Sequence, residues 1–159
     1  MIRKAEMADL DRLTEIESIC FPSAEAAGRE ALEQRLRAFP LHFWVMEEEG
    51  LVIGFINGMA TDEPVITDVM FENAFLHKAD GQWQSVFGLD VLPAYRGRGY
   101  AAQLMQALIA DARAAGRRGC ILTCKAHLLH YYEKFGYRSL GISDSQHGGA
   151  QWYDMVLEF

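Results

Sequence analysis

"VFGLDVLPAYRGRGYAA", residues 86–102, is the stretch that decides the fold of this chain. Its apolar part, Val86 to Leu92, predicts a buried strand that ends near Pro93, because proline has no N–H to donate to a neighbouring strand. A glycine-rich turn, Arg96 to Gly99, follows. Residues 100–109 then combine strong helix formers with helical apolar spacing. The stretch therefore predicts a strand, a tight turn and a helix in immediate succession.

This succession is suited to bind a phosphate group. The first amides of a helix have no partner within the helix, and the helix dipole places partial positive charge there. Gly97 and Gly99 let the backbone approach an anion closely. Arg96 and Arg98 add positive charge and paired N–H donors. We therefore expect this turn to hold a diphosphate.

The turn is neither of the common nucleotide-binding loops. No Lys-Ser/Thr pair follows Gly99, and the glycine spacing differs from the GxGxxG of dinucleotide-binding folds. The turn matches R/Q-x-x-G-x-G/A, and together with the strand before it, in "LDVLPAYRGRGYA", it resembles the GNAT superfamily of acyl-CoA-dependent N-acyltransferases. The resemblance implies an α/β (α+β) GNAT fold, with a mixed, mostly antiparallel sheet of about seven strands. Helices would cover both faces, and the sheet would splay at the central strand.

Length and composition agree with one globular domain over residues 1–159. Half of the residues are hydrophobic, and the net charge of −7 argues against a nucleic-acid partner. No apolar run is long enough to span a bilayer, and the first residues are no signal peptide. The three cysteines are expected to be reduced thiols of a cytoplasmic protein, and the x3 spacing of Cys120 and Cys124 does not favour a metal site.

The periodicity of the chain predicts the other elements around the central strand, residues 83–92. Residues 61–82 are the least regular part, and we expect them to form a partly acidic loop. The expected helices are 10–20 with Asp9 as N-cap, 24–39 with Ser23 as N-cap, 98–115 ended by Gly116, and 128–135. The expected strands are 2–5, the hairpin 43–60, 119–124 parallel to the central strand, 137–140, and 151–159 antiparallel at the end of the chain.

The GNAT resemblance implies acetyl transfer from acetyl-CoA, a cosubstrate, to a primary amine by direct attack in a ternary complex, with no metal. Backbone amides of Leu89, Asp90 and Val91 would bind the thioester carbonyl and the pantetheine arm. The pyrophosphate would lie on Arg96, Gly97, Arg98, Gly99, Tyr100, Ala101 and Ala102. The transfer also needs a group that takes the amine's proton and an acid for the leaving thiolate.

The acid is predicted to be Tyr132. "HYYEKFGY" resembles the family element Y-x-x-x-G-[FY], in which the tyrosine hydroxyl points at the sulfur of CoA. A phenol with a pKa of about 10 is able to protonate a departing thiolate. Tyr131 and Tyr137 are the neighbouring alternatives, and the spacing to Gly136 favours Tyr132.

The group that would serve as the base is the point at which this sequence departs from the family pattern. Residues 43–159 resemble the arylalkylamine (serotonin-type) N-acetyltransferases, which carry two histidines on the central strand. The matching positions here are Ser85 and Phe87, so that pair is absent. Ser85 is the expected catalytic position, where its hydroxyl would hold a water that relays the proton. Other groups that the sequence offers as the base are Asp62, Glu63, Glu72, His127 and His130.

The acceptor is expected to be a small amine, with aromatic amines among the candidates. The resemblance places Phe21 and Pro22 beside the acceptor pocket, although Phe21 equally fits a core position, and Phe87 would add an apolar wall. The loop 61–82 would lie over this pocket. Two alternatives remain open at this point: an amine on a protein or peptide, and a non-catalytic acyl-CoA sensor. The chain is expected to be a monomer or a homodimer, with no membrane partner.

Overall fold

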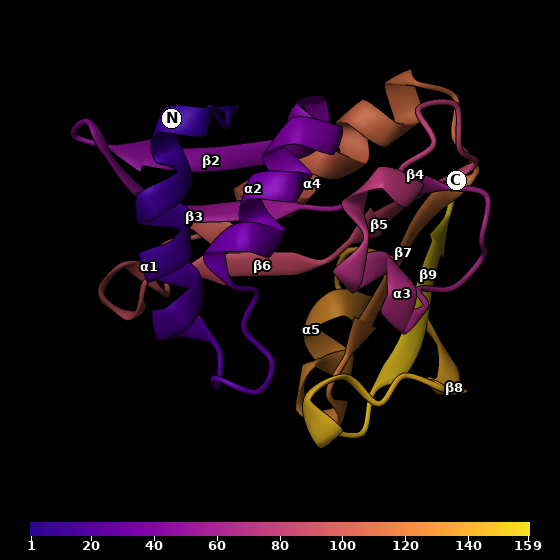
Figure 1. Ribbon diagram of the computed structural model, residues 1–159. Coiled ribbons are helices and arrows are strands. Elements are labelled where there is room, and N and C mark those ends of the chain that lie inside the picture. The colour runs from indigo at the N-terminus through magenta and orange to yellow at the C-terminus, as the bar shows by residue number, and fades with distance from the viewer.

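The computed structural model describes residues 1–159 and contains nine strands in two sheets (Figure 1). The first sheet has the strand order β1-β2-β3-β6 and the second the order β4-β5-β7-β9-β8. The strands are β1 (Ile2–Lys4), β2 (Phe43–Glu48), β3 (Leu51–Asn57), β4 (Ala60–Thr61), β5 (Trp83–Val86), β6 (Gly88–Val91), β7 (Gly119–Cys124), β8 (Arg138–Ile142) and β9 (Tyr153–Glu158). The α-helices are α1 (Leu10–Cys20), α2 (Arg29–Ala38), α3 (Asp68–Glu72), α4 (Tyr100–Ala114) and α5 (Leu129–Glu133).

The expected central strand is present but divided at Phe87. β5 pairs with β7 in parallel, as the sequence predicts, with Ser85 opposite Ile121. β6 pairs instead with β3, antiparallel, with Asp90 opposite Phe55. Because β6 is the last strand of its sheet, its other edge has no strand partner. The division raises the strand count above the seven expected, and it produces the predicted splay (Figure 1).

Helices pack on both faces of the first sheet, as expected. On one face, α1 and α2 bury an apolar cluster against β2 and β3 that includes Leu13, Leu32 and Phe55. On the other face, α4 buries Leu104 and Leu108 against both sheets. α4 begins after Gly99, whose φ of 83° is in the left-handed region that glycine adopts freely. The N-terminus of α4 therefore opens beside the unpaired edge of β6. No helix of the fold has the length and the apolar character that crossing a bilayer requires.

The second helix is shorter than the sequence predicts. Residues 24–28 form a loop, and the N-cap of α2 is Gly28, so Ser23 does not cap this helix. A buried carboxylate explains the loop, because Glu17 of α1 accepts a hydrogen bond of 2.9 Å from the amide of Ala27. Asp9 precedes α1 as predicted, but its carboxylate accepts from the amide of Glu6 in the preceding turn.

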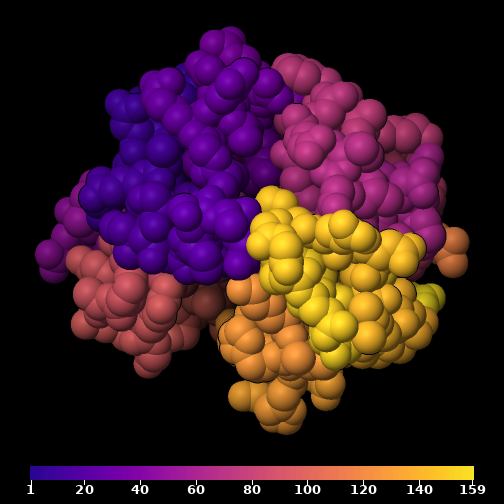
Figure 2. All heavy atoms as spheres, turned by 60° about the horizontal axis from the view of Figure 1, so that its bottom comes forward, coloured from indigo at the N-terminus to yellow at the C-terminus, as the bar shows by residue number.

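Three segments interlock where the two sheets diverge, and we call their contacts the loop clasp: residues 21–28, helix α3, and residues 143–152 (Figure 2). Lys125 binds Glu25 at 2.8 Å, and the His147 ring nitrogen Nε2 lies 2.8 Å from the carbonyl oxygen of Glu25. Asp68 of α3 accepts from Ser145 Oγ and from the amide of Gln146.

Gly148 lies where two segments of the loop clasp, residues 143–152 and 21–28, come into close contact. Its φ is 63°, and a Cβ added there would lie 2.6 Å from Glu25 Cγ and 2.9 Å from the carbonyl oxygen of Ala24. The backbones of residues 148 and 24 are therefore in direct contact, with no room for a side chain between them.

Replacing Asp68 by alanine should loosen the loop clasp. The substitution removes the acceptor for both Ser145 and Gln146, and each hydrogen bond is worth about 1 kcal/mol. Amide hydrogen exchange at Gln146 should become roughly tenfold faster. Asp62→Ala is the matched control, because Asp62 binds Lys78 and Gln82 away from the clasp. Unchanged exchange at Gln146 in Asp68→Ala would contradict this role.

Candidate active site

Two open spaces meet between the diverging sheets. The first, the cleft, lies at the N-terminus of α4 and has a volume of about 490 Å³. The second, the cavity, lies under the loop clasp and has a volume of about 350 Å³. Four residues line both spaces: Phe21, Leu89, Leu128 and Tyr132. These four residues define a junction through which a molecule in the cleft can reach one in the cavity.

The cleft contains most of the turn that the sequence identifies as a phosphate site. It is lined by Leu89, Val91, Arg96, Gly97, Gly99, Tyr100, Ala101 and Ala102, among others. Gly97 and Gly99 have φ values of 77° and 83°, and nothing lies within 4 Å of a Cβ added at either. The free amides at the start of α4 and the open space above both glycines fit an anionic group.

Two of the predicted cofactor residues do not line the cleft. Arg98 is exposed, and its guanidinium lies 5.4 Å from the centre of the Tyr95 ring. The Asp90 side chain is buried away from the cleft, so only its backbone remains available for the predicted contact. Arg96 does line the cleft, and its Nε donates to the carbonyl oxygen of Val91 at 2.9 Å.

Tyr132 lies at the junction, whereas its two neighbouring tyrosines do not. Tyr131 lines the cleft alone. Tyr137 is buried in the core, where its hydroxyl donates to Met105 Sδ at 3.5 Å. Burial raises the pKa of the Tyr132 phenol above its ordinary value, so the phenol keeps its proton at neutral pH. Tyr132 thus places a protonated hydroxyl at the border of both spaces.

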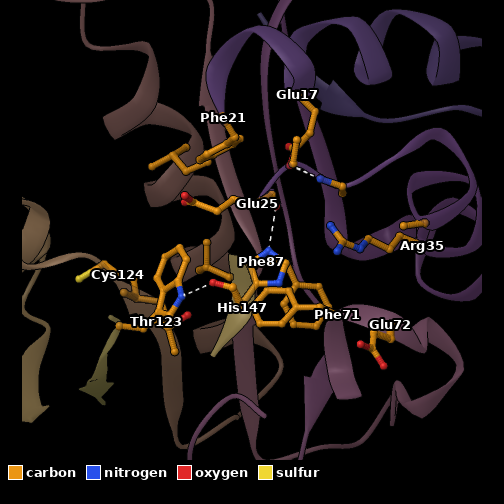
Figure 3. Close-up of a pocket in the computed structure, with 18 of the residues that line it drawn as sticks. Glu17, Phe21, Glu25, Arg35, Phe71, Glu72, Phe87, Thr123, Cys124 and His147 are labelled. Atoms are coloured by element: carbon orange, nitrogen blue, oxygen red, sulfur yellow. Dashed lines mark hydrogen bonds between the residues drawn. The ribbon is translucent and has the colours of Figure 1, made fainter. Parts of the chain in front are cut away.

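Aromatic rings and carboxylates together form the wall of the cavity (Figure 3). His147 stacks on Phe71 with ring centres 5.0 Å apart, and Phe71 lies at the same distance from Phe87. The Trp152 ring nitrogen donates to the carbonyl oxygen of His147 at 2.8 Å, which holds the loop against the cavity. The carboxylates are Glu17, Glu25 and Glu72, and the one guanidinium is that of Arg35.

The charged wall of the cavity continues into a buried polar cluster of Glu17, Arg35, Asn57 and Asp90. Arg35 Nη1 donates to Asn57 Oδ1 at 3.2 Å, and its guanidinium lies 5.0 Å from the centre of the Phe87 ring. Glu17 is 5 % exposed and Asp90 1 % exposed. Burial and the neighbouring Glu17 carboxyl raise the pKa of Asp90 well above its ordinary value.

The structure corrects the predicted catalytic role of Ser85. Its side chain is fully buried and lines neither space, and its hydroxyl donates to the carbonyl oxygen of Met59 at 2.8 Å. Since side chains alternate along a strand, Ser85 faces away from the side on which Val86 meets the cavity. A water held by Ser85 would have no access to an amine in the cavity.

Some of the other candidate residues line the cavity, and others line neither space. Phe21 and Phe87 line the cavity as expected, whereas Pro22 is exposed and lines neither space, because the chain turns outward after Phe21. Of the alternative bases only Glu72 lines the cavity. Asp62 forms an exposed ion pair with Lys78. Glu63, His127 and His130 are exposed and line neither space.

Two charged residues that line the cavity, Glu17 and Arg35, were not predicted as site residues from the sequence. The apolar spacing of their helices nevertheless contained a signal for each. Glu17 follows the apolar spacing of Leu13 and Ile16 on α1. Arg35 lies between Leu32 and Leu36 in the apolar stripe of α2. A charge on the apolar face of a helix is buried when the helix packs, and a buried charge needs a partner. Nothing comparable pointed to His147 or Trp152, which reach the cavity through loop contacts.

Comparisons with known proteins identify the family to which this fold belongs. The family model described as Acetyltransferase (GNAT) family matches residues 10–137. The "Probable hydrolase YhcX" of Bacillus subtilis (strain 168) is 28% identical over 169 residues, which cover the whole chain and 32% of that protein. The chain thus spans about a third of that relative's length.

Solved structures agree with the family match. A structure titled "GphF GNAT-like decarboxylase in complex with isobutyryl-CoA" has a TM-score of 0.85 at 22% identity and covers 99% of this chain and 98% of its own. "Arabidopsis thaliana Naa50 in complex with bisubstrate analogue CoA-Ac-MVNAL" has a TM-score of 0.76 at 13% identity, with coverage of 100% and 98%. With the family model matching most of its length, the chain belongs to the Acetyltransferase (GNAT) family.

Proposed function

We propose that this protein is an acetyl-CoA-dependent N-acetyltransferase that acts on a small primary amine carrying an apolar group. The observation that carries the proposal is the junction: two separate spaces, one suited to an anionic nucleotide and one to a cation, meet at a buried phenol. Transfer between two bound molecules needs such an arrangement, because the amine and the thioester must be held together.

Coenzyme A would occupy the cleft. The amides of residues 97–101 and the guanidinium of Arg96 would hold the pyrophosphate, as at other helix N-termini that bind phosphates. The unpaired edge of β6 would offer backbone donors to the pantetheine arm and to the thioester carbonyl at Leu89 to Val91. Both structural relatives described above carry a CoA derivative in their titles, which supports this placement.

The cavity favours a cationic amine of small size. Its carboxylates attract an ammonium group, and its aromatic rings accommodate an apolar body or a cation over a ring face. A volume of about 350 Å³ fits a small molecule, and the loop clasp lies over the space that an extended peptide would need. The resemblance to arylalkylamine N-acetyltransferases suggests an aromatic amine, and this finer assignment stays a prediction.

In the proposed reaction, the amine loses a proton in the cavity and its lone pair attacks the thioester carbonyl carbon at the junction. The carbonyl oxygen, which becomes negative, is stabilised by backbone N–H donors of β6. When the carbon–sulfur bond breaks, its electron pair goes to sulfur, which receives the phenolic proton of Tyr132. The second proton of the nitrogen restores the phenol, so one proton is released in each turnover.

A thiol-release assay with acetyl-CoA and a panel of amines tests the proposal. The panel contains aromatic amines, aliphatic polyamines and peptides with free N-termini. Turnover with small amines and little with peptides is the expected result. Turnover with peptides alone would establish the protein-acetylating alternative, and CoA binding without turnover on any amine would support the sensor alternative.

A second candidate is decarboxylation of an acyl-CoA that bears a free carboxylate. The observation in its favour is Arg35, a buried guanidinium that lines the cavity and has an unpartnered Nε. One structural relative is titled a decarboxylase. Three carboxylates in the same wall oppose an anionic acyl group, which is why we rank this candidate second. Release of CO₂ from malonyl-CoA without any amine would establish it.

Gly99→Asp should abolish CoA binding. The new side chain enters the open space at the start of α4 and places a negative charge where the pyrophosphate would lie. Calorimetry with CoA should show at least a hundredfold weaker binding, about 3 kcal/mol. Gly116→Asp is the matched control, because Gly116 also has a positive φ, at the other end of the same helix. Equal affinity in both variants would refute the assignment of the cleft.

Tyr132→Phe should lower kcat by about a hundredfold, the usual contribution of a general acid, with CoA affinity changed less than twofold. The control is Tyr137→Phe, which removes a neighbouring hydroxyl that is buried in the core and donates to the Met105 sulfur. Steady-state kinetics with the best amine of the panel makes the comparison. A normal kcat in Tyr132→Phe would remove the acid role from this residue.

A further inference from the structure

The buried polar cluster next to the cavity takes no part in the transfer of the Tyr132 proton. Of the seven buried side-chain nitrogen and oxygen atoms that lack a hydrogen-bond partner in the whole protein, five belong to the polar cluster next to the cavity. They are Glu17 Oε1, Arg35 Nε, Asn57 Nδ2 and both carboxylate oxygens of Asp90. Buried polar atoms without partners are costly, so a group of five in one place calls for a function.

These atoms surround an open point beside Gly88. A Cβ added at Gly88 would lie 3.1 Å from Asp90 Oδ1 and 3.7 Å from both Asn57 Nδ2 and Glu17 Oε1. The three side chains come from three different elements, β6, β3 and α1. Glycine therefore leaves a polar recess at this position, and since Gly88 and Glu17 both line the cavity, the recess opens into it. Gly88 is also adjacent to Leu89 of the junction.

Two carboxyl groups, of Glu17 and Asp90, lie in this recess beside a single positively charged group. The ionisable groups that face Asp90 are Glu17 and Cys20 from α1, Arg35 from α2 and, across the junction, Tyr132. Only Arg35 among them is positive. Two buried carboxylates beside a single guanidinium cannot both ionise at low cost. Burial and Glu17 raise the pKa of Asp90 well above its ordinary value, which favours a proton retained in the recess.

We propose that Glu17 and Asp90 share one proton and that Glu17 is the group that takes a proton from the acceptor amine. The inference rests on the function proposed above and supplies the base that the central strand lacks. Glu17 is held for this role, because its Oε2 accepts from the amide of Ala27 while its Oε1 remains unpartnered at the recess. A carboxylate in a water-poor recess attracts an ammonium group more strongly than it does in water.

Each proton in this step can be accounted for. An ammonium group enters the cavity and gives one proton to the Glu17 carboxylate, so that the pair then holds two protons and Arg35 its positive charge. The neutral amine attacks the thioester. After the acetylated product leaves, the pair returns one proton to solvent, which is the proton that the overall transfer releases. Arg35 compensates the one negative charge that the pair carries before the amine binds, and the proton shared with Asp90 keeps the pair from carrying two.

Glu17→Gln tests the role of the base. The variant keeps the shape of Glu17 but cannot accept the proton, so kcat/KM for the best amine should fall by about a hundredfold near pH 7. The deficit should shrink as pH rises, because a growing fraction of the amine is then neutral before it binds. Glu17→Asp should recover part of the lost rate. Glu15→Gln is the matched control, since Glu15 is exposed on the same helix and pairs with Arg12.

Infrared spectroscopy of the protein without ligands tests the shared proton independently of activity. The wild type should show the carbonyl band of a protonated carboxylic acid near neutral pH, and the band should disappear in both Asp90→Asn and Glu17→Gln. Its loss in Glu17→Gln is decisive, because burial of Asp90 is unchanged in this variant and would by itself keep a proton on Asp90. A band that persists in Glu17→Gln would show a proton held by Asp90 through burial only and would overturn the pair.

The two experiments separate failure of the inference from failure of the proposed function. If wild-type protein acetylates small amines and Glu17→Gln keeps the wild-type pH profile, the base lies elsewhere and only the inference fails. If no amine is acetylated, the proposed function fails, and the infrared band still decides whether the two carboxyls share a proton. Calorimetry with acetyl-CoA should give the same affinity, within about twofold, for the wild type and for the Glu17, Asp90 and Glu15 variants, which excludes a general loss of the fold.

Discussion

The structure depends on the exchange of strand partners at Phe87. Before this residue the chain pairs with β7, and after it the chain pairs with β3 in another sheet. A strand that changes sheets leaves backbone groups of β6 without a strand partner and leaves space between the two sheets. Unpaired backbone N–H groups must find a partner, and a thioester or an amide-containing arm provides one. The binding site is therefore a consequence of incomplete strand pairing.

The central stretch could be interpreted from sequence because its signals are local. Pro93 ends a strand, Gly99 adopts a positive φ, and the residues from Tyr100 onward favour a helix whatever lies around them. Local preferences of this kind also predicted the hairpin of β2 and β3, the parallel pairing of residues 119–124 and the last antiparallel strand. The resemblance to a family added the splay, which no periodicity in the chain indicates.

The acceptor side could be predicted less well because it depends on contacts between distant segments. Ser23 looks like an N-cap, yet the Glu17 carboxylate holds the amide of Ala27 and delays the helix to Arg29. The family resemblance predicts a catalytic role for Ser85, yet its hydroxyl donates to the carbonyl oxygen of Met59. The direction of a side chain on a strand reverses with a shift of one residue, so counting along a divided strand does not fix the face to which a side chain points. Charges on apolar helix faces, such as Glu17 and Arg35, were the informative signal.

Gly148 shows how the two halves of the site differ in their freedom to change over evolution. At this position two backbones touch, so a larger residue has nowhere to go, and selection cannot adjust the cavity by substituting it. Inserting or deleting residues in the segment 143–150, by contrast, would raise or lower the roof of the cavity without disturbing α4. New acceptor preferences are thus open to this scaffold through changes in loop length, while the nucleotide half stays the same.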